Sequence, residues 1–246
     1  GDISDDFLPR LRSRVEQELG IPGLNVLVNA SHTHPPGRML CHDDQQVERT
    51  FDAIRRAQAT LVPVTVGVGV GHEDRIMINR TLRLKDGKGW TIRHANPCPP
   101  EDQVAGLGPV DPEIGILRVD RLHGSPPAAV HNFASHLLMG SPQGNVGHVT
   151  ADHVGVARKY LEDAIGGGVM AFFLQGAGGD VNEVAVADHS NRNRVKEFGT
   201  RLAQSVMAGY AKVTAAPGTL RGDAPLAGPA LLGDEDVQHV GLASER

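Results

Sequence analysis

The sequence predicts an α/β fold: a layered, largely mixed β-sheet flanked by helices, with loops at the carboxyl ends of strands forming the site. Two observations lead to this expectation. Amphipathic helical patterns alternate along the chain with short apolar runs that end in glycine, proline or polar residues. Three of these runs lead directly into histidine-rich or glycine-rich sequences, and ligands of open α/β sheets gather at such positions.

The first part of the chain is predicted to hold two helices and two strands. In order, these are a helix over residues 4–19, a strand over 24–30, a helix over 43–59 and a strand over 61–70. Ser4 or Asp6 is the expected cap of the first helix, and Gly20 is its expected end. The glycine run at residues 67–71 lacks a following helix and is not a dinucleotide-binding sequence.

The second part begins with a Gly-, Pro- and charge-rich excursion and then returns to regular patterns. The predicted elements are the excursion over residues 81–113, a strand pair over 114–119 and 128–134, a helix over 151–165, a strand over 169–174 and a helix over 191–211. The apolar run of the last strand is typical of burial on both faces. We therefore expect one α/β domain over residues 1–213 and a loosely ordered or extended segment over 214–246.

Composition excludes several classes of function. The formal net charge is −5 and only 4% of residues are aromatic, which argues against nucleic acid as a partner. No apolar run is long enough for a transmembrane segment, and no signal peptide is visible at Gly1. Two cysteines far apart exclude a disulfide framework. The oligomeric state and the compartment cannot be read from these features.

Histidines are the most informative polar residues of the chain. His32 and His34 follow the predicted strand over 24–30, and His136 follows the one over 128–134. Imidazoles at strand ends can hold a metal ion or move a proton, and three of them could form part of a zinc site. The alternative is that these are loop or interior histidines that make local hydrogen bonds.

Two further groups lie at strand ends. Arg80 ends a short apolar run, where its guanidinium could stabilise an oxyanion or form a surface ion pair. The turn that contains Gly178, Gly179 and Asp180 follows the strand over 169–174. Its small residues would let backbone N–H groups approach a substrate oxygen, or would serve a tight turn with positive φ. The HExxH, GxSxG and Walker patterns are absent.

Taken together, four ordered motifs resemble those of the neutral/alkaline, non-lysosomal ceramidase family, in its amino-terminal catalytic domain. They are Asn25-Val26-Leu27-Val28-Asn29-Ala30-Ser31-His32-Thr33-His34, Ile78-Asn79-Arg80, His131-Asn132-Phe133-Ala134-Ser135-His136, and Ala151-Asp152 with the run from Phe172 to Val181. Their order and spacing agree with the family over about residues 1–210. The chain thus resembles a partial or divergent member.

The resemblance implies a Zn²⁺-dependent hydrolase that cleaves the amide bond of a ceramide-like N-acyl lipid, or a related ester, with a metal-activated water. Carried over by position, His32 and His136 would bind zinc, while His34 and Arg80 would handle protons and the oxyanion. The substrate would be a small-molecule or lipid amide. Relatives of this kind are often exported, which suggests an extracytoplasmic protein.

The chain departs from the family pattern at two places. Asn182 and Glu183 stand where the family has a catalytic serine and a proline, so Asn182 could only donate a hydrogen bond to the oxyanion. The family's downstream glutamate and tyrosine zinc ligands have no matching segment after residue 210. Two alternatives therefore stay open: a non-catalytic remnant that binds a ligand, and a metal-dependent amidohydrolase of another fold.

Overall fold

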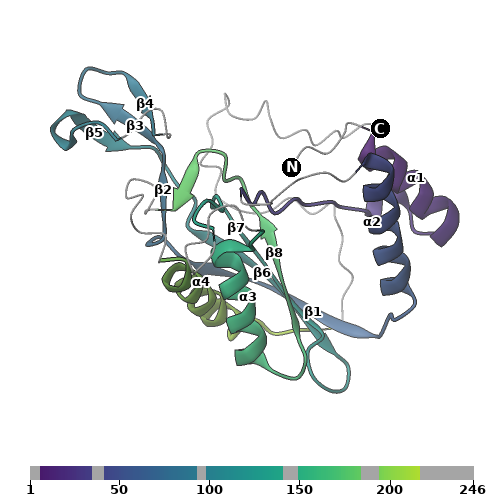
Figure 1. The fold of residues 1–246 in the computed structure, drawn as a ribbon. Helices are drawn as coiled ribbons and strands as arrows, with labels where there is room; N and C mark the ends of the chain where they lie inside the picture. The colour runs from purple at the N-terminus through teal and green to yellow at the C-terminus, as the bar shows by residue number, and fades with distance from the viewer. Residues whose placement is uncertain (1–5, 35–41, 93–97, 141–148, 184–193, 217–246) are drawn as a thin grey trace.

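A computed structural model describes residues 6–34, 42–92, 98–140, 149–183 and 194–216, and its ribbon is shown in Figure 1. The helices are α1 (Phe7–Leu19), η1 (Gly23–Asn25), α2 (Asp43–Gln58), η2 (Glu101–Gln103), α3 (Asp152–Ile165) and α4 (Val195–Tyr210). The strands are β1 (Val64–His72), β2 (Met77–Asn79), β3 (Thr81–Leu84), β4 (Gly89–Thr91), β5 (Val104–Leu107), β6 (Glu113–Arg121), β7 (Ala128–Phe133), β8 (Met170–Gln175) and β9 (Val181–Glu183).

The main sheet has four strands in the order β1-β6-β7-β8. β6 pairs antiparallel with β1 and β7, as expected for the predicted strand pair, whereas β7 and β8 run parallel. The connection from β7 to β8 passes through α3, which packs with α4 against one face of the sheet (Figure 1). The predicted mixed sheet flanked by helices is therefore confirmed.

Glycines let α4 and the residues after it lie close to β1. A Cβ added at Gly67 would lie 2.5 Å from the carbonyl oxygen of Thr214, and one at Gly69 would lie 2.5 Å from Cγ2 of Val213. On the helix itself, a Cβ at Gly209 would lie 2.9 Å from the carbonyl oxygen of Val70. The glycine run of β1 thus serves close packing.

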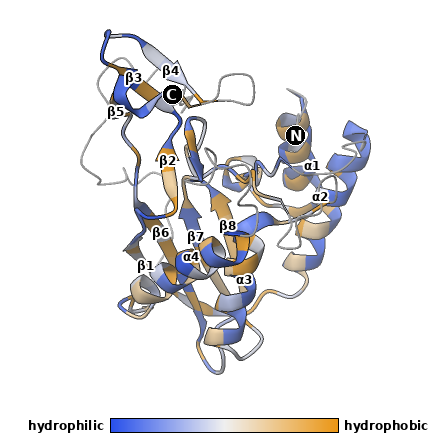
Figure 2. Ribbon diagram, turned by 60° about the vertical axis from the view of Figure 1, so that its left-hand side comes forward, coloured by the Kyte–Doolittle hydropathy of each residue, from blue (hydrophilic) through white to orange (hydrophobic). Residues whose placement is uncertain are grey.

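The opposite face of the main sheet stays largely open among the described residues. Phe172 of β8 is 45% exposed and Val68 of β1 is 74% exposed, although both strands are apolar. Figure 2 shows hydrophobic colour along β8, which is an edge strand of the main sheet. The expected burial of residues 169–174 on both faces is therefore wrong, because no second layer of described residues covers the outward side chains.

The excursion over residues 81–113 contains a small sheet that the sequence did not predict. Its strand order is β4-β3-β5, and it projects from the main sheet in Figure 1. Between β1 and this small sheet, β2 lies outside the main sheet and pairs antiparallel with β9. This two-stranded unit places residues 181–183 next to the loop after β7, where the candidate site lies.

Helices α1 and α2 form a second, smaller core. Phe7, Leu11 and Val15 of α1 pack with Val47 and Phe51 of α2, as the predicted helical spacing requires. Gly20 ends α1 with a left-handed φ of 68°, as expected. Asp6 is at the cap position but makes no side-chain capping bond, and Ser4 lies outside the described residues.

The strand predicted over residues 24–30 does not form. Residues Gly23–Asn25 make a single 3₁₀ turn, and the chain from there to residue 32 is irregular. Leu27 is 82% exposed, so the alternating pattern does not place this side chain in a core. The histidines thus follow a docked irregular segment and not a buried strand.

The other predicted helices are confirmed by α2, α3 and α4, although residues 191–193 lie outside the described part. Most of the segment over 214–246 also lies outside it. None of the described helices combines the length and the apolar character needed to cross a bilayer.

His131 of β7 gives the fold a testable pH dependence. Burial lowers the pKa of this ring to about 4, from 6.5. As the pH falls, His131 is protonated in the unfolded chain before it is protonated in the folded chain. The free energy of unfolding is therefore unaffected by this ring above pH 6.5 and decreases as the pH drops to 4, by about 3 kcal/mol at most. We expect His131→Leu to remove this loss, measured as the free energy of urea unfolding at several pH values. His72→Leu, at an exposed histidine, is the control. A variant-to-wild-type difference that does not change with pH would contradict the prediction.

Candidate metal centre

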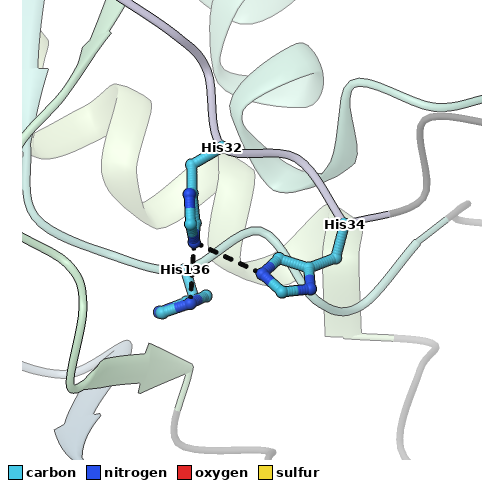
Figure 3. A group of neighbouring side chains, drawn as sticks. All are labelled: His32, His34 and His136. Atoms are coloured by element: carbon cyan, nitrogen blue, oxygen red, sulfur yellow. Dashed lines mark hydrogen bonds between the residues drawn. The ribbon is translucent and has the colours of Figure 1, made fainter. Parts of the chain in front are cut away.

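Three imidazoles meet beyond the carboxyl end of β7 (Figure 3). Nε2 of His32 lies 3.0 Å from Nε2 of His136 and 3.3 Å from Nε2 of His34. The three rings come from two segments of the chain: His32 and His34 are two residues apart, and His136 lies 104 residues after His32. All three thus present a ring nitrogen to one small volume.

The segment that carries His32 and His34 is attached at two places, to the loop after β7 and to the end of β8. Thr33 forms a parallel bridge with Leu137, and the backbone N–H of His34 donates to the Leu137 carbonyl at 3.0 Å. Further back, the side-chain amide of Asn29 pairs with the backbone of Gln175, donating at 3.0 Å and accepting at 2.9 Å. Asn29 therefore takes the place of a neighbouring strand at the end of β8.

His136 contacts the first residue of β9 through both its backbone and its ring. Its backbone N–H donates to the Val181 carbonyl at 2.9 Å, and its Nδ1 lies 3.3 Å from the same oxygen. A carbonyl oxygen can only accept, so this contact favours the tautomer with the proton on Nδ1. Nε2 of His136 then carries a lone pair directed at the other rings, as a metal ligand requires.

The surroundings of His34 and His136 favour the neutral form of these two rings. Loss of solvent around the crowded rings, followed by the neighbouring His32 imidazole, lowers the pKa of both His34 and His136. The charge of Arg80 lowers both pKa values further, which places its guanidinium within electrostatic reach of the group. Neutral imidazole is the form that binds metals.

The donor set fits zinc. Two nitrogens bound to a tetrahedral zinc ion at 2.0–2.1 Å lie about 3.3–3.4 Å apart, close to both separations between the rings. The ring nitrogens of His32 and His136, predicted as ligands, can thus reach one ion together. Their role as ligands stays a prediction, and a chain of hydrogen-bonded imidazoles is the alternative.

His32 has a backbone φ of 54°, in the left-handed region. Among the described non-glycine residues only Asp152 shares this feature. L-residues adopt this conformation at a cost, and it persists where the surroundings fix it. Here the Thr33–Leu137 bridge fixes the next residue and the turn directs the His32 ring towards His136.

The other predicted site residues lie around this group with different roles. Asn182 is buried in β9 next to Val181, and its Oδ1 has no hydrogen-bond partner among the described residues. Arg80 follows β2, and its backbone N–H donates to the Asp180 carbonyl at 2.7 Å. The antiparallel pairing of β2 with β9 is therefore what places residues 80 and 182 on neighbouring strands.

The glycine turn lacks the positive φ that one of its two predicted roles requires, while its role as a set of N–H donors to a substrate oxygen stays a prediction. The N–H of Gly178 donates to the Gly176 carbonyl at 2.8 Å, so it is already used within the turn. The Asp180 carboxylate accepts from the Asn79 side chain at 2.8 Å. Neither Gly178 nor Gly179 has a positive φ. Gly178 lies instead where a Cβ would come within 2.7 Å of the Gln175 side chain, so close packing explains this glycine.

A second polar cluster lies beside the first and was not predicted as a site. Asp152, His153 and Glu183 are all buried, and each offers a ligand atom within 4.8 Å of the others. Burial raises the pKa of Glu183 to about 7, while the His153 ring opposes the shift. The sequence shows only an acidic residue at a helix start and a glutamate after Asn182, with no spacing that joins them.

Comparison with solved structures identifies the fold. The chain is similar to a ceramidase complexed with C2, with a TM-score of 0.62 and 19% identity over 85% of this chain and 34% of that one. It is also similar to the neutral ceramidase of Pseudomonas aeruginosa, with a TM-score of 0.60 and 19% identity over 85% and 35%. This is a ceramidase-like fold.

The ceramidase-like chain spans about a third of the length of those structures. No family model matches its sequence, and no curated protein matches it. The resemblance in the motifs and the similarity in fold therefore agree, while the described strands form open sheets and give no support to a closed barrel.

The Asn29 contact predicts a local effect. We expect Asn29→Ala to raise the exchange rate of the Gln175 amide proton at least about fivefold, because the substitution removes its acceptor and lowers local stability by about 1 kcal/mol or more. Amide exchange followed by NMR is the measurement. Asn132→Ala is the matched control, since Asn132 donates to the same strand at Leu174 without accepting from it. Unchanged exchange at Gln175 would refute the docking.

Proposed function

We propose that this ceramidase-like chain is a zinc-dependent hydrolase of an amide bond, or of a related ester, and that its substrates are N-acyl compounds of the ceramide type. The observation that carries the proposal is the convergence of three imidazole nitrogens at 3.0 and 3.3 Å. The fold similarity to ceramidases, one of them complexed with C2, supports the substrate class.

His32 and His136 would hold the ion. The His136 ring is buried and oriented through its Nδ1, and the left-handed turn at His32 directs the second ring to the same volume. When bound there, zinc would lower the pKa of a water molecule and polarise the acyl carbonyl. The lowered pKa values of His34 and His136 favour the unprotonated form that such a site requires of its ligands.

The surrounding groups would manage protons and charge. His34, like His32, is exposed, so its Nε2 is placed to take and return a proton at the solvent side. Arg80 already acts electrostatically on His34 and His136, and its charge would stabilise an oxyanion. Asn182 would contribute an amide donor from the buried strand beside them.

A non-catalytic ligand-binding role is the second candidate. Asn182 stands where the resembling family has its catalytic serine, so any step that needs a hydroxyl at this position is lost. A water-based reaction does not need that hydroxyl, and this is why we favour the hydrolase. Turnover separates the two roles.

Zinc binding tests the centre directly. We expect about one equivalent of zinc per chain after dialysis against zinc, measured by metal analysis, and at least tenfold weaker binding in His32→Ala and His136→Ala because each loses one ligand. His34→Ala should keep zinc and lose turnover. His72→Ala, at an exposed histidine outside the group, is the control. Zinc below a tenth of an equivalent in the wild-type protein would reject the proposal.

Turnover tests the chemistry. With a short-chain N-acylsphingosine and a panel of aryl amides and esters, we expect zinc-dependent hydrolysis at near-neutral pH. Arg80→Ala should lower kcat about 10²- to 10³-fold with little change in KM, because the lost charge acts on the transition state. Wild-type protein that binds zinc yet hydrolyses none of these compounds would favour the ligand-binding role.

A further inference from the structure

The loop that carries His136 is bound on two sides through its backbone, as a strand inside a sheet would be. On one side, the Leu137 carbonyl accepts from the His34 N–H, and Leu137 bridges Thr33. On the other side, the N–H of His136 donates to the Val181 carbonyl of β9. The loop therefore lies between the His32–His34 segment and β9, and its position sets the distance between the rings.

Beyond His136, two carboxylates replace the carbonyl groups that a longer β9 would supply. The N–H of Leu138 donates to Oε1 of Glu183 at 2.8 Å, and the N–H of Gly140 donates to Oδ2 of Asp152 at 2.6 Å. Alternate N–H groups of the loop, at positions 136, 138 and 140, are thus all bound from the same side.

His153 joins the two carboxylates. Its Nδ1 lies 3.0 Å from Oδ1 of Asp152 and 3.7 Å from Oε1 of Glu183. The side chains of all three residues are at most 1% exposed. No lysine or arginine is among their recorded partners in the described part of the chain. Buried carboxylates are costly, so packing alone does not account for two of them behind one loop.

We propose that Asp152 and Glu183 are positioning residues of the metal centre, which hold the loop over residues 136–140 so that His136 and His34 meet His32. This inference rests on the proposed function, since it assigns these residues an effect on metal binding. In this role neither carboxylate would be a ligand of the ion. Both act through backbone N–H groups, in the way that groups outside a metal shell orient its ligands.

The experiment measures binding of Co²⁺ alone to the whole chain, by titration of its visible absorption bands, which report ligand geometry. We expect Glu183→Ala and Asp152→Ala to bind Co²⁺ about 10- to 100-fold more weakly, with altered bands. Glu183→Gln keeps an oxygen that can accept the Leu138 N–H, and it should restore affinity to within about threefold of wild type.

Glu73→Ala is the matched control. Glu73 is also a buried glutamate, but it binds Arg75 and Ser205 and makes no contact with the loop. This variant should lose stability without losing Co²⁺ affinity. Equal affinity in Glu183→Ala and wild type, or an equal loss in Glu73→Ala, would overturn the inference.

Two further outcomes keep the test decisive. If the alanine variants do not fold, Glu183→Asp replaces them, because the shorter side chain withdraws the oxygen from Leu138; it should bind Co²⁺ more weakly than Glu183→Gln, and the reverse order would refute the inference. If wild-type protein binds no metal, the proposed function fails first. If metal affinity falls in His32→Ala and His136→Ala but equals that of wild type in Glu183→Ala and Asp152→Ala, the proposed function stands and only the positioning role is removed.

Discussion

The backbone pairing between His136 and Val181 is the contact on which the arrangement of the site depends. β7 and β8 run parallel, so their carboxyl ends stop at the same edge of the sheet. The chain turns after β8 and returns as β9, whose first carbonyl receives both the N–H and the Nδ1 of His136. One pairing thus joins the two strand ends, orients the buried ring and leaves its Nε2 facing the other histidines.

The elements that the sequence predicts well are those whose partners lie nearby or whose pattern is long. α2, α3, α4 and the β6–β7 pair match their predicted ranges because helical spacing and a short turn are local properties. The segment over residues 24–30 has an equally apolar pattern, but a strand needs a neighbour to receive its N–H groups. Only the Asn29 side chain meets the edge of β8 there, so the pattern does not become a strand.

The candidate site follows the same division. His32 and His136 could be selected from the sequence because each follows an apolar run, and both do lie together. The cluster of Asp152, His153 and Glu183 could not, because it forms only when the start of α3 meets the end of β9 behind the loop. The close approach of Gly178 to the Gln175 side chain could not be predicted for a related reason, because no local rule of backbone conformation contains it.

The left-handed backbone at His32 is a conformation that costs free energy for any residue with a Cβ, including the histidine that stands there. Glycine or asparagine would adopt this φ with less strain, and either would make the segment easier to fold. Neither carries an imidazole. A thermostability screen would therefore select against histidine at this position, and its presence despite the cost agrees with the proposed role of its imidazole.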